Sequence, residues 1–245
     1  MKAFLIVLII FAACLTALTQ ESSRIDILLE EADKALENSD FEKSLEKVDR
    51  ALIQYPDNIK ALQKRINIYY QMNDIKEASR LVDEAIKKFP AETEFYYLQG
   101  LINIAKKKYY KAVNNFNKVL ELEMSVDQYK VYLNRGVANL NLQEFNLAIE
   151  DLTKSIELNN ANASAYHSRG MVYYELEDYE SAVDNFMQAI DLSQDNPVTF
   201  FNLGMSYYRL EDKESACPHF HKACSMGDKN ACRMAFGECS KSLPR

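Results

Sequence analysis

The residues of this 245-residue chain whose type and spacing could do chemistry are four cysteines near its end. Cys217, Cys224, Cys232 and Cys239 follow one another at intervals of 7, 8 and 7 residues, and the fifth cysteine, Cys14, lies near the start. Four thiols this close can form two disulfides or bind one zinc ion. Structural zinc sites usually place ligands in pairs about two to four residues apart. The spacing therefore favours disulfides, and we predict no metal site.

The pairing of the four cysteines depends on the elements that carry them. The sequence predicts two helices joined by a turn over 226–230, with one cysteine pair on each helix. Cysteines seven residues apart on one helix have Cα atoms about 10.5 Å apart, whereas a disulfide tolerates roughly 7 Å. This excludes a bridge within either helix. In an antiparallel hairpin the inner pair is Cys224–Cys232 and the outer pair is Cys217–Cys239, and we predict these two nested disulfides.

Glycines show that such hairpins recur along the chain. Four of the 6 glycines, Gly100, Gly136, Gly170 and Gly204, stand 36, 34 and 34 residues apart. A glycine inside a helix costs roughly 1 kcal/mol relative to alanine, so its recurrence indicates a close approach of two helices. Each of the four has an aromatic residue four positions before it, alanine twelve after it and a bulky apolar residue sixteen after it. The repeated unit is therefore a helix hairpin.

This frame resembles the tetratricopeptide repeat (TPR), a 34-residue hairpin with the pattern W-x2-L-G-x2-Y, then A-x3-F, then P. The resemblance is clearest where Phe200, Leu203 and Tyr207 surround Gly204 and Phe220 follows. It implies an all-α fold, a right-handed solenoid of about six TPR hairpins with a C-terminal capping helix. An extra pair of residues, 127–128, marks a lengthened turn. The predicted repeats are 25–58, 59–92, 93–126, 129–162, 163–196 and 197–230, followed by the capping helix and tail over 231–245.

The first residues have the pattern of an export signal. A basic start, Met1-Lys2, precedes an uncharged stretch to Thr19 that is shorter than the roughly 20 apolar residues a membrane span needs. Two interpretations stay open. Residues 1–19 form a cleaved signal peptide, or residues 1–13 form a lipoprotein signal, because Phe11-Ala12-Ala13-Cys14 resembles a bacterial lipobox with Cys14 as the lipid anchor. We therefore expect an exported chain that is periplasmic, secreted or lipid-anchored to the envelope. The cysteine-bearing end is also similar to exported Sel1-like repeat proteins.

Catalytic patterns are scarce in the sequence. It has 3 histidines and shows no G-x-S-x-G, H-E-x-x-H or phosphate-binding glycine loop. We expect no catalysis and no cofactor, and we expect His219 and His221 to face solvent. The net charge of −7, with acidic and basic residues interspersed, argues against a nucleic-acid partner.

The resemblance to TPR proteins implies that the first helix of each hairpin lines a concave groove. The side chains at the lining positions are apolar or aromatic, and methionine adds adaptability. We expect a protein or peptide ligand there; the alternative is that these side chains pack only against their own neighbours. Two other functions stay open: an envelope assembly lipoprotein factor, and an accessory subunit with a cryptic hydrolase site. The predicted groove residues are Tyr97, Leu101, Val137, His167, Met171, Tyr174, Phe201, Met205 and Tyr208.

Overall fold

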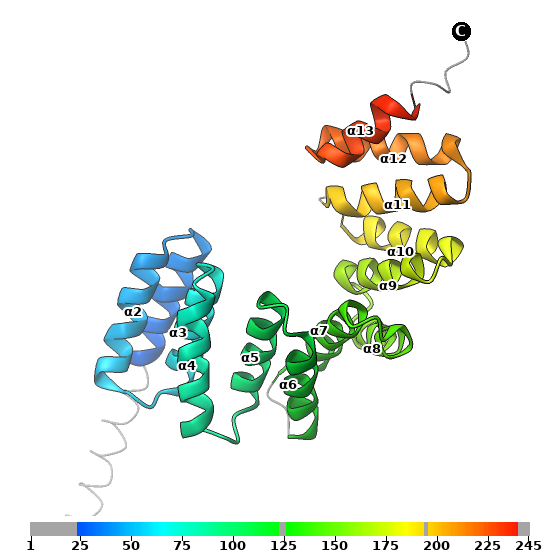
Figure 1. Ribbon diagram of the computed structural model, residues 1–245. Helices are drawn as coiled ribbons and strands as arrows, with labels where there is room; N and C mark the ends of the chain where they lie inside the picture. Colours follow the sequence, from blue (N-terminus) through cyan, green and yellow to red (C-terminus); the bar gives the residue numbers. More distant parts are fainter. Residues whose placement is uncertain (1–23, 123–125, 194–195, 240–245) are drawn as a thin grey trace, which may run out of the picture. The chain divides into compact units, whose positions relative to one another are not determined.

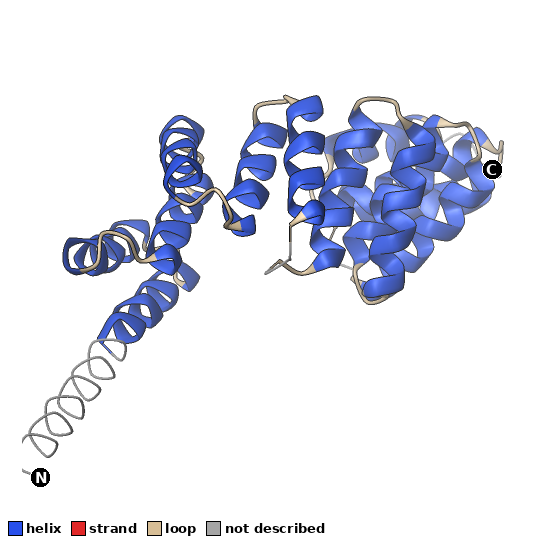
Figure 2. Cartoon of the chain, turned by 90° about the horizontal axis from the view of Figure 1, so that it is seen from below, coloured by secondary structure: helices blue, strands red, loops and turns tan. Residues whose placement is uncertain are grey.

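The computed structural model describes residues 24–122, 126–193 and 196–239 of the chain. Across these ranges all regular secondary structure is helical, and short turns join the helices (Figures 1 and 2). This confirms the all-α prediction. The predicted signal segment, whether 1–19 or 1–13, lies outside the described residues, as does Cys14. No helix in the described part has the length and apolar character that crossing a bilayer requires.

The helices follow one another as hairpins. A first helix runs through 24–37 and pairs with α2 (Phe41–Gln54), and a single helix, α13 (Lys229–Gly237), ends the described chain. The predicted lengthened turn ends where α7 begins at Gln128, with Asp127 at its N-cap. The hairpins between them are α3 (Ile59–Gln71) with α4 (Ile75–Lys88), α5 (Thr93–Ala105) with α6 (Tyr109–Glu121), α7 (Gln128–Asn141) with α8 (Phe145–Leu158), α9 (Ala163–Glu175) with α10 (Tyr179–Leu192), and α11 (Pro197–Arg209) with α12 (Lys213–Ser225).

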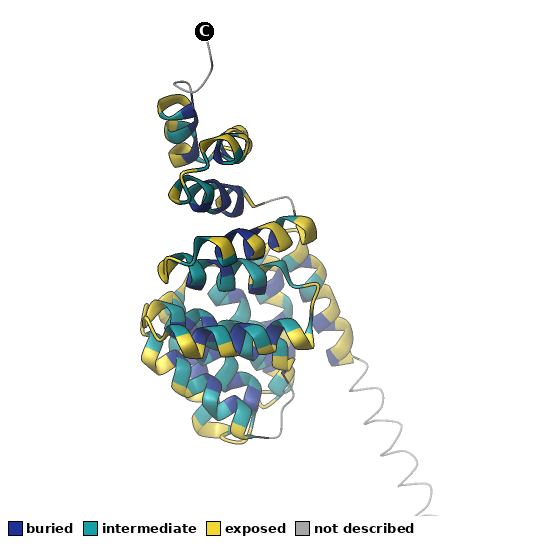
Figure 3. Cartoon of the chain, turned by 90° about the vertical axis from the view of Figure 1, so that its right-hand side faces the viewer, coloured by how far each residue is buried: buried dark blue, intermediate teal, exposed yellow. Residues whose placement is uncertain are grey.

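The chain forms two compact units, and the boundary falls within α5, between Ile102 and Asn103. In the first unit, Val48, Ala51 and Ile68 are among the buried core residues. In the second unit the apolar residue sixteen positions after each repeat glycine is fully buried. Buried, half-buried and exposed positions alternate along each helix, and the turns are largely exposed (Figure 3). The buried residues of that second-unit series are Phe116, Leu152, Phe186 and Phe220.

The turn inside each hairpin repeats one backbone conformation. In the α9–α10 turn, Glu177 has a left-handed φ of 62°, and its N–H donates to the carbonyl of Tyr174. The N–H of Asp178 donates to the carbonyl of Tyr173, which completes a Schellman ending for α9. The Asp178 side chain then caps α10 by accepting from the N–H of Ser181. The same left-handed position is occupied in the other hairpins by Ser39, Asn73, Lys107, Gln143 and Glu211.

The repeat glycines of the second unit lie where two helices meet. A Cβ placed on Gly170 would stand 2.8 Å from Cε1 of Phe186, sixteen residues later. Such a contact is too short for a real side chain, so the phenylalanine can occupy that space only because glycine leaves it open. The packing reason inferred from the sequence therefore holds at this crossing.

An arginine joins the polar parts of neighbouring hairpins. Arg135 on α7 donates through Nε and Nη2 to the two carboxylate oxygens of Asp151, at 2.9 and 2.6 Å, and through Nη1 to Asn117 Oδ1 at 2.7 Å. One repeat later, Arg169 donates to Asn185 Oδ1 at 2.8 Å. The side chain of Asp151 is only 5% exposed. Arg169 also donates to Thr153 Oγ1 on α8 at 3.1 Å. Each arginine thus joins the two helices of its own hairpin and also contacts the preceding hairpin. Nothing in the glycine-centred repeat pattern marks these residues.

Candidate functional site

The first helices of the last three hairpins lie next to one another. α9 contacts both α7 and α11. Two side-chain contacts join α9 to α11 directly: Thr199 Oγ1 lies 2.9 Å from His167 Nδ1, and Asn202 Nδ2 donates to Met171 Sδ at 3.0 Å. The predicted groove residues on these helices are therefore neighbours in space. We call this set, which belongs to α7, α9 and α11, the inner row: Val137, His167, Met171, Tyr174, Phe201, Met205 and Tyr208.

The other two predicted groove residues, Tyr97 and Leu101, lie on the part of α5 that belongs to the first unit. All nine predicted groove residues are half-buried. A half-buried side chain both contacts the core and reaches solvent, so the inner row combines the two roles that the sequence analysis set against each other.

Two α11 residues of the inner row, Phe201 and Tyr208, have their orientation fixed by contacts with neighbouring side chains. The ring centroids of Phe201 and Tyr208 lie 6.0 and 6.5 Å from that of Phe220. The Tyr208 hydroxyl donates to Glu238 Oε2 at 3.3 Å, and Lys213 Nζ donates to the same oxygen at 3.3 Å. These contacts fix the orientation of the Tyr208 ring at the end of the row. A surface ordered in this way loses little side-chain entropy when a ligand binds.

His167 and Tyr174, two α9 residues of the inner row, pack against aromatic rings. The ring of His167 lies 5.5 Å from that of Phe186, and burial lowers the pKa of its imidazole below the usual value. His167 is therefore neutral near pH 7. Tyr174 packs edge-on against Tyr179 at 5.4 Å. A pocket of about 140 Å³ opens beside His167, and its polar lining comes from Ser164, Ser168, Ser193, Asn196 and Thr199.

The C-terminal cysteines lie in two close pairs that join α12 to α13. The sulfurs of Cys217 and Cys239 are 2.05 Å apart, with Cα atoms 5.6 Å apart. Those of Cys224 and Cys232 are 1.98 Å apart, with Cα atoms 4.5 Å apart. These are the pairs that the helix-rise argument selects. Among the described residues, no group of three or more His, Cys, Asp or Glu side chains is arranged to hold a metal ion.

The expectation that His219 faces solvent is wrong. Its ring lies parallel to that of Tyr207, 5.7 Å between centroids and 6° between planes, and 6.4 Å from that of Phe200. Burial in this aromatic stack lowers the pKa of His219. The sequence reasoning missed it because the position carries no histidine in the other repeats. His221 is exposed, as expected.

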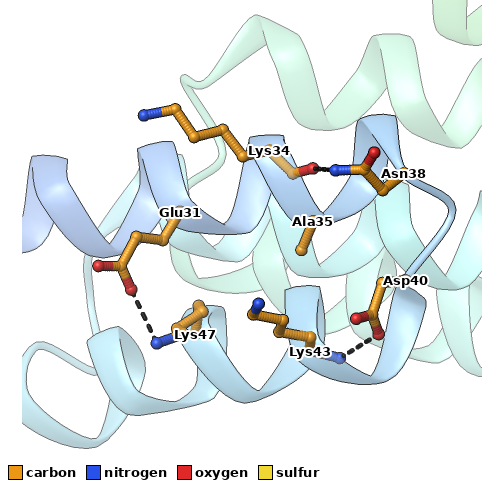
Figure 4. A pocket seen from close by; sticks show the side chains of 7 residues that line it. All are labelled: Glu31, Lys34, Ala35, Asn38, Asp40, Lys43 and Lys47. Carbon is orange, nitrogen blue, oxygen red and sulfur yellow. Dashed lines mark hydrogen bonds and ion pairs between the residues drawn. The ribbon is translucent and has the colours of Figure 1, made fainter.

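The first unit has a separate, polar hollow of about 350 Å³ between the first helix and α2 (Figure 4). Lys47 pairs across it with Glu31 at 2.7 Å, while Lys34 pairs with Glu30 at 2.7 Å along the first helix. Its charged groups are thus largely matched to each other. Nothing in the sequence pattern marked this hollow, and its composition does not point to a ligand.

Comparison with known families adds to this geometry. A family model described as "TPR repeat" matches residues 170–211, and one described as "Tetratricopeptide repeat" matches 129–162 and 198–230. A third, described as "TT21 fifth ARM repeats domain", matches 27–132. This chain therefore carries tetratricopeptide repeats.

Solved TPR structures share the fold. PilW, described as a widely conserved type IV pilus biogenesis factor, superposes with a TM-score of 0.79 at 16% identity over 86% of this chain and 97% of its own. PilF of Pseudomonas aeruginosa gives 0.76 at 15% identity over 89% of this chain and 100% of its own. YrrB, described as a TPR protein with an unusual peptide-binding site, gives 0.58 at 21% identity over 80% and 98%. At these identities the likeness concerns the fold.

Curated sequence relatives match shorter segments of this TPR chain. The AimR transcriptional regulator of Bacillus phage phi3T is 38% identical over 80 residues, which is 31% of this chain and 20% of the regulator. The SGT1 homolog of Oryza sativa subsp. japonica is 31% identical over 87 residues, 36% of this chain and 23% of that protein. The chain thus spans about a fifth of the length of the curated relatives it matches.

Proposed function

We propose that this TPR protein is an exported scaffold that binds a protein or peptide along the inner row and has no catalysis of its own. The observation that carries the proposal is the half-burial of seven apolar, aromatic or imidazole side chains on three adjacent first helices. Six of these side chains contact buried core residues, and all seven keep partial exposure to solvent. Surfaces of this composition, rich in tyrosine, phenylalanine and methionine, are typical of protein-binding sites.

The packing beneath the row supports binding of an extended or helical peptide. Such a ligand gains affinity from a few aromatic anchors that are already ordered before it arrives. Phe201 and Tyr208 fit that description because their rings rest on Phe220. Met171 and Met205 each lie between two ring-bearing residues of the row on the same helix. Their flexible thioethers can adjust to the shape of a ligand.

Export is the second part of the proposal. The signal-like start and the two nested disulfides both suit an oxidising compartment. Mass spectrometry of the mature N-terminus tests this part. A chain that begins at Gln20 supports cleavage of the 1–19 segment, and a diacylated Cys14 supports the lipoprotein form. A cytosolic chain that retains Met1 contradicts export.

An envelope assembly factor is one specific form of the same proposal. It is favoured by the fold likeness to PilW, itself a pilus biogenesis factor. An accessory subunit with a cryptic hydrolase site is the alternative from another class. It predicts turnover of an ester or peptide substrate, whereas a scaffold predicts capture without turnover.

The experiment that tests binding is selection of peptides from a displayed random library against the purified protein, followed by fluorescence anisotropy of the selected peptide. Val137→Glu places a charge in the inner row while keeping a good helix former, and it should weaken binding about tenfold or more. Leu147→Glu is the matched control, since Leu147 is 51% exposed on α8, a second helix outside the row. Equal binding by both variants and the parent contradicts the proposal.

A further inference from the structure

In the second unit, the turns that join the two helices of each hairpin lie along one edge. Each helix from α6 to α12 packs against the next one in the chain. Because consecutive packed helices are joined by short connections, they alternate in direction. The N-terminal ends of α6, α8, α10 and α12 therefore lie along the same edge. We call the four turns at these ends the turn row: 106–108, 142–144, 176–178 and 210–212.

The turn row has a basic end. Its first turn is Lys106-Lys107-Lys108, and it continues into Tyr110, which is 70% exposed, and Lys111. Within the described residues, the side chains of Lys107, Lys108 and Lys111 form no ion pair. A chain with a net charge of −7 thus concentrates positive charge at one place on this edge.

The rest of the turn row is acidic. The other three turns read Leu-Gln-Glu, Leu-Glu-Asp and Leu-Glu-Asp; Arg209 and Lys213 flank the last of them, and Lys213 pairs with Glu238. Asp178 and Asp212 cap the helices that follow, while Glu144, Glu177 and Glu211 form no ion pair within the described part of the chain.

Apolar surface accompanies these charges at the tips of the turns. Leu142 is 36% exposed and Leu176 is 43% exposed. Tyr110 supplies a large exposed ring at the basic end. The row therefore has both the charge and the apolar contact area that a docking surface needs.

We propose that the turn row is a self-association surface, on which a second copy of the chain docks edge to edge and turned round by a twofold axis. In that arrangement the basic turn 106–108 of each copy faces the acidic turn 210–212, at the far end of the row, in the other copy, and this contact occurs twice. A twofold contact of this kind closes on itself as a dimer. The exposed tyrosine and leucines supply apolar area at the contact, and the charges set its register and association rate.

The occupant is identified by the presence of both signs on one row. A uniformly anionic lipid surface would attract the lysine turn and repel the three acidic turns beside it. An acidic or basic peptide would likewise satisfy one end only. A reversed second copy neutralises both ends at once, so the charge pattern favours self-association over either alternative.

Sedimentation velocity of the purified chain, kept without reductant, measures this directly. At about 50 mM salt the weight-average mass should rise with protein concentration towards twice that of the chain, and at about 0.5 M salt it should return to that of the monomer, because salt screens exposed charges. Two exchange variants sharpen the test. Lys107→Glu/Lys108→Asp gives the first turn the acidic pair found at 177–178 and 211–212, and Glu177→Lys/Glu211→Lys places lysine at the left-handed position that Lys107 already occupies.

Both variants should fold, because each borrows a residue that the same turn accepts elsewhere in the chain. Each alone should dimerise at least about tenfold more weakly than the parent. An equimolar mixture of the two should recover a mixed dimer, because the contacts at both ends of the row are again complementary. Lys222→Glu/Lys229→Glu, on the opposite edge, is the control and should dimerise like the parent.

Several results would overturn the proposal. They are a monomer at every salt and protein concentration, a dimer indifferent to both exchange variants, and a mixture that stays monomeric. Binding of the parent to vesicles rich in phosphatidylglycerol, or to polyglutamate, without self-association would also overturn it and assign the lysine turn to another class of partner.

Discussion

Gly204 lies directly against the ring of Phe220, sixteen residues later. A Cβ on Gly204 would stand 2.7 Å from Cε1 of the ring and 3.3 Å from the backbone oxygen of Ala216. The same relationship joins Gly170 to Phe186 and, with a leucine in place of the phenylalanine, recurs at Gly136. The hairpin is therefore closed by a large side chain on the second helix that occupies the space left by a glycine on the first.

Gly204→Ala should destabilise the protein although alanine is the better helix former. The new methyl group would collide with a fully buried ring and a backbone oxygen, and overpacking of this kind costs about 1–3 kcal/mol. Gly237→Ala is the matched control, because nothing lies within 4 Å of a Cβ there. It should be neutral or stabilising by up to about 1 kcal/mol. Urea unfolding of both variants checks the prediction, and equal effects on the unfolding midpoint would count against it.

Loss of stability at Gly204 should also stay local. Repeat proteins are held together by contacts between neighbouring repeats. Hydrogen exchange of Gly204→Ala should therefore quicken most in α10 to α13, whereas α2 and α3 of the first unit should keep their protection. Uniform loss of protection along the chain would contradict this picture.

Asp151 should tolerate asparagine better than leucine. Asp151→Leu leaves the guanidinium of Arg135 without its bidentate partner in a half-buried position, and removing one partner of a buried pair costs about 3–5 kcal/mol. Asp151→Asn keeps an oxygen acceptor for Arg135, as Asn185 does for Arg169 one repeat later. The difference in unfolding free energy between the two variants measures the effect. A leucine variant as stable as the asparagine variant would show that the arginine contacts contribute little.

The fold could be predicted well from the sequence because the same repeat pattern occurs several times along the chain. Gly136, Gly170 and Gly204 mark the same crossing, so a pattern that is ambiguous once becomes definite by recurrence. Single-copy features were harder. His219 stacks on Tyr207 only because this repeat has a tyrosine and a histidine that meet across one hairpin, and no periodic signal announces such a pair.

The turns and the inner row show the same limit. Glycine or asparagine is the usual residue at a left-handed helix ending, but Lys107 and Glu177 occupy it here, and nothing in their type predicts that conformation. For the inner row, the sequence predicted which residues share a register but not how deeply each is buried. Half-burial depends on the distance between neighbouring helices, which is a tertiary property.

Stability should fall as the pH is lowered through about 6.5. Burial lowers the pKa of His167 and His219 in the folded state, so the unfolded chain binds protons that the folded chain does not. The resulting loss begins near the unfolded pKa of about 6.5 and levels off below the folded pKa values. Thermal unfolding between about pH 7.5 and pH 5 measures this slope. His167→Gln/His219→Gln should flatten it relative to His221→Gln, the exposed control; an unchanged slope in the double variant would contradict the assignment.

Removal of either disulfide should destabilise the α12–α13 end. Each bridge should contribute roughly 2–4 kcal/mol, more for Cys217–Cys239 because it closes a separation of 22 residues against 8 for Cys224–Cys232. Thermal unfolding of Cys217→Ser/Cys239→Ser and Cys224→Ser/Cys232→Ser tests the order. Non-reducing peptide mapping of the parent should recover the two pairs, and four free thiols in protein isolated without reductant would contradict both the pairing and the proposed compartment.

The most direct test of the proposed function is whether a ligand contacts the inner row. A photo-crosslinking residue placed at Val137 or Met171 should form a covalent adduct with a peptide selected against the protein, and mass spectrometry should locate that adduct at the substituted position. The same residue placed at Leu147 on α8 should give no adduct with that peptide. Adducts at both inner-row positions and none at the control are the result we predict. Adducts only at Leu147, or at none of the three positions despite measurable binding, would contradict the assignment of the inner row as the binding site.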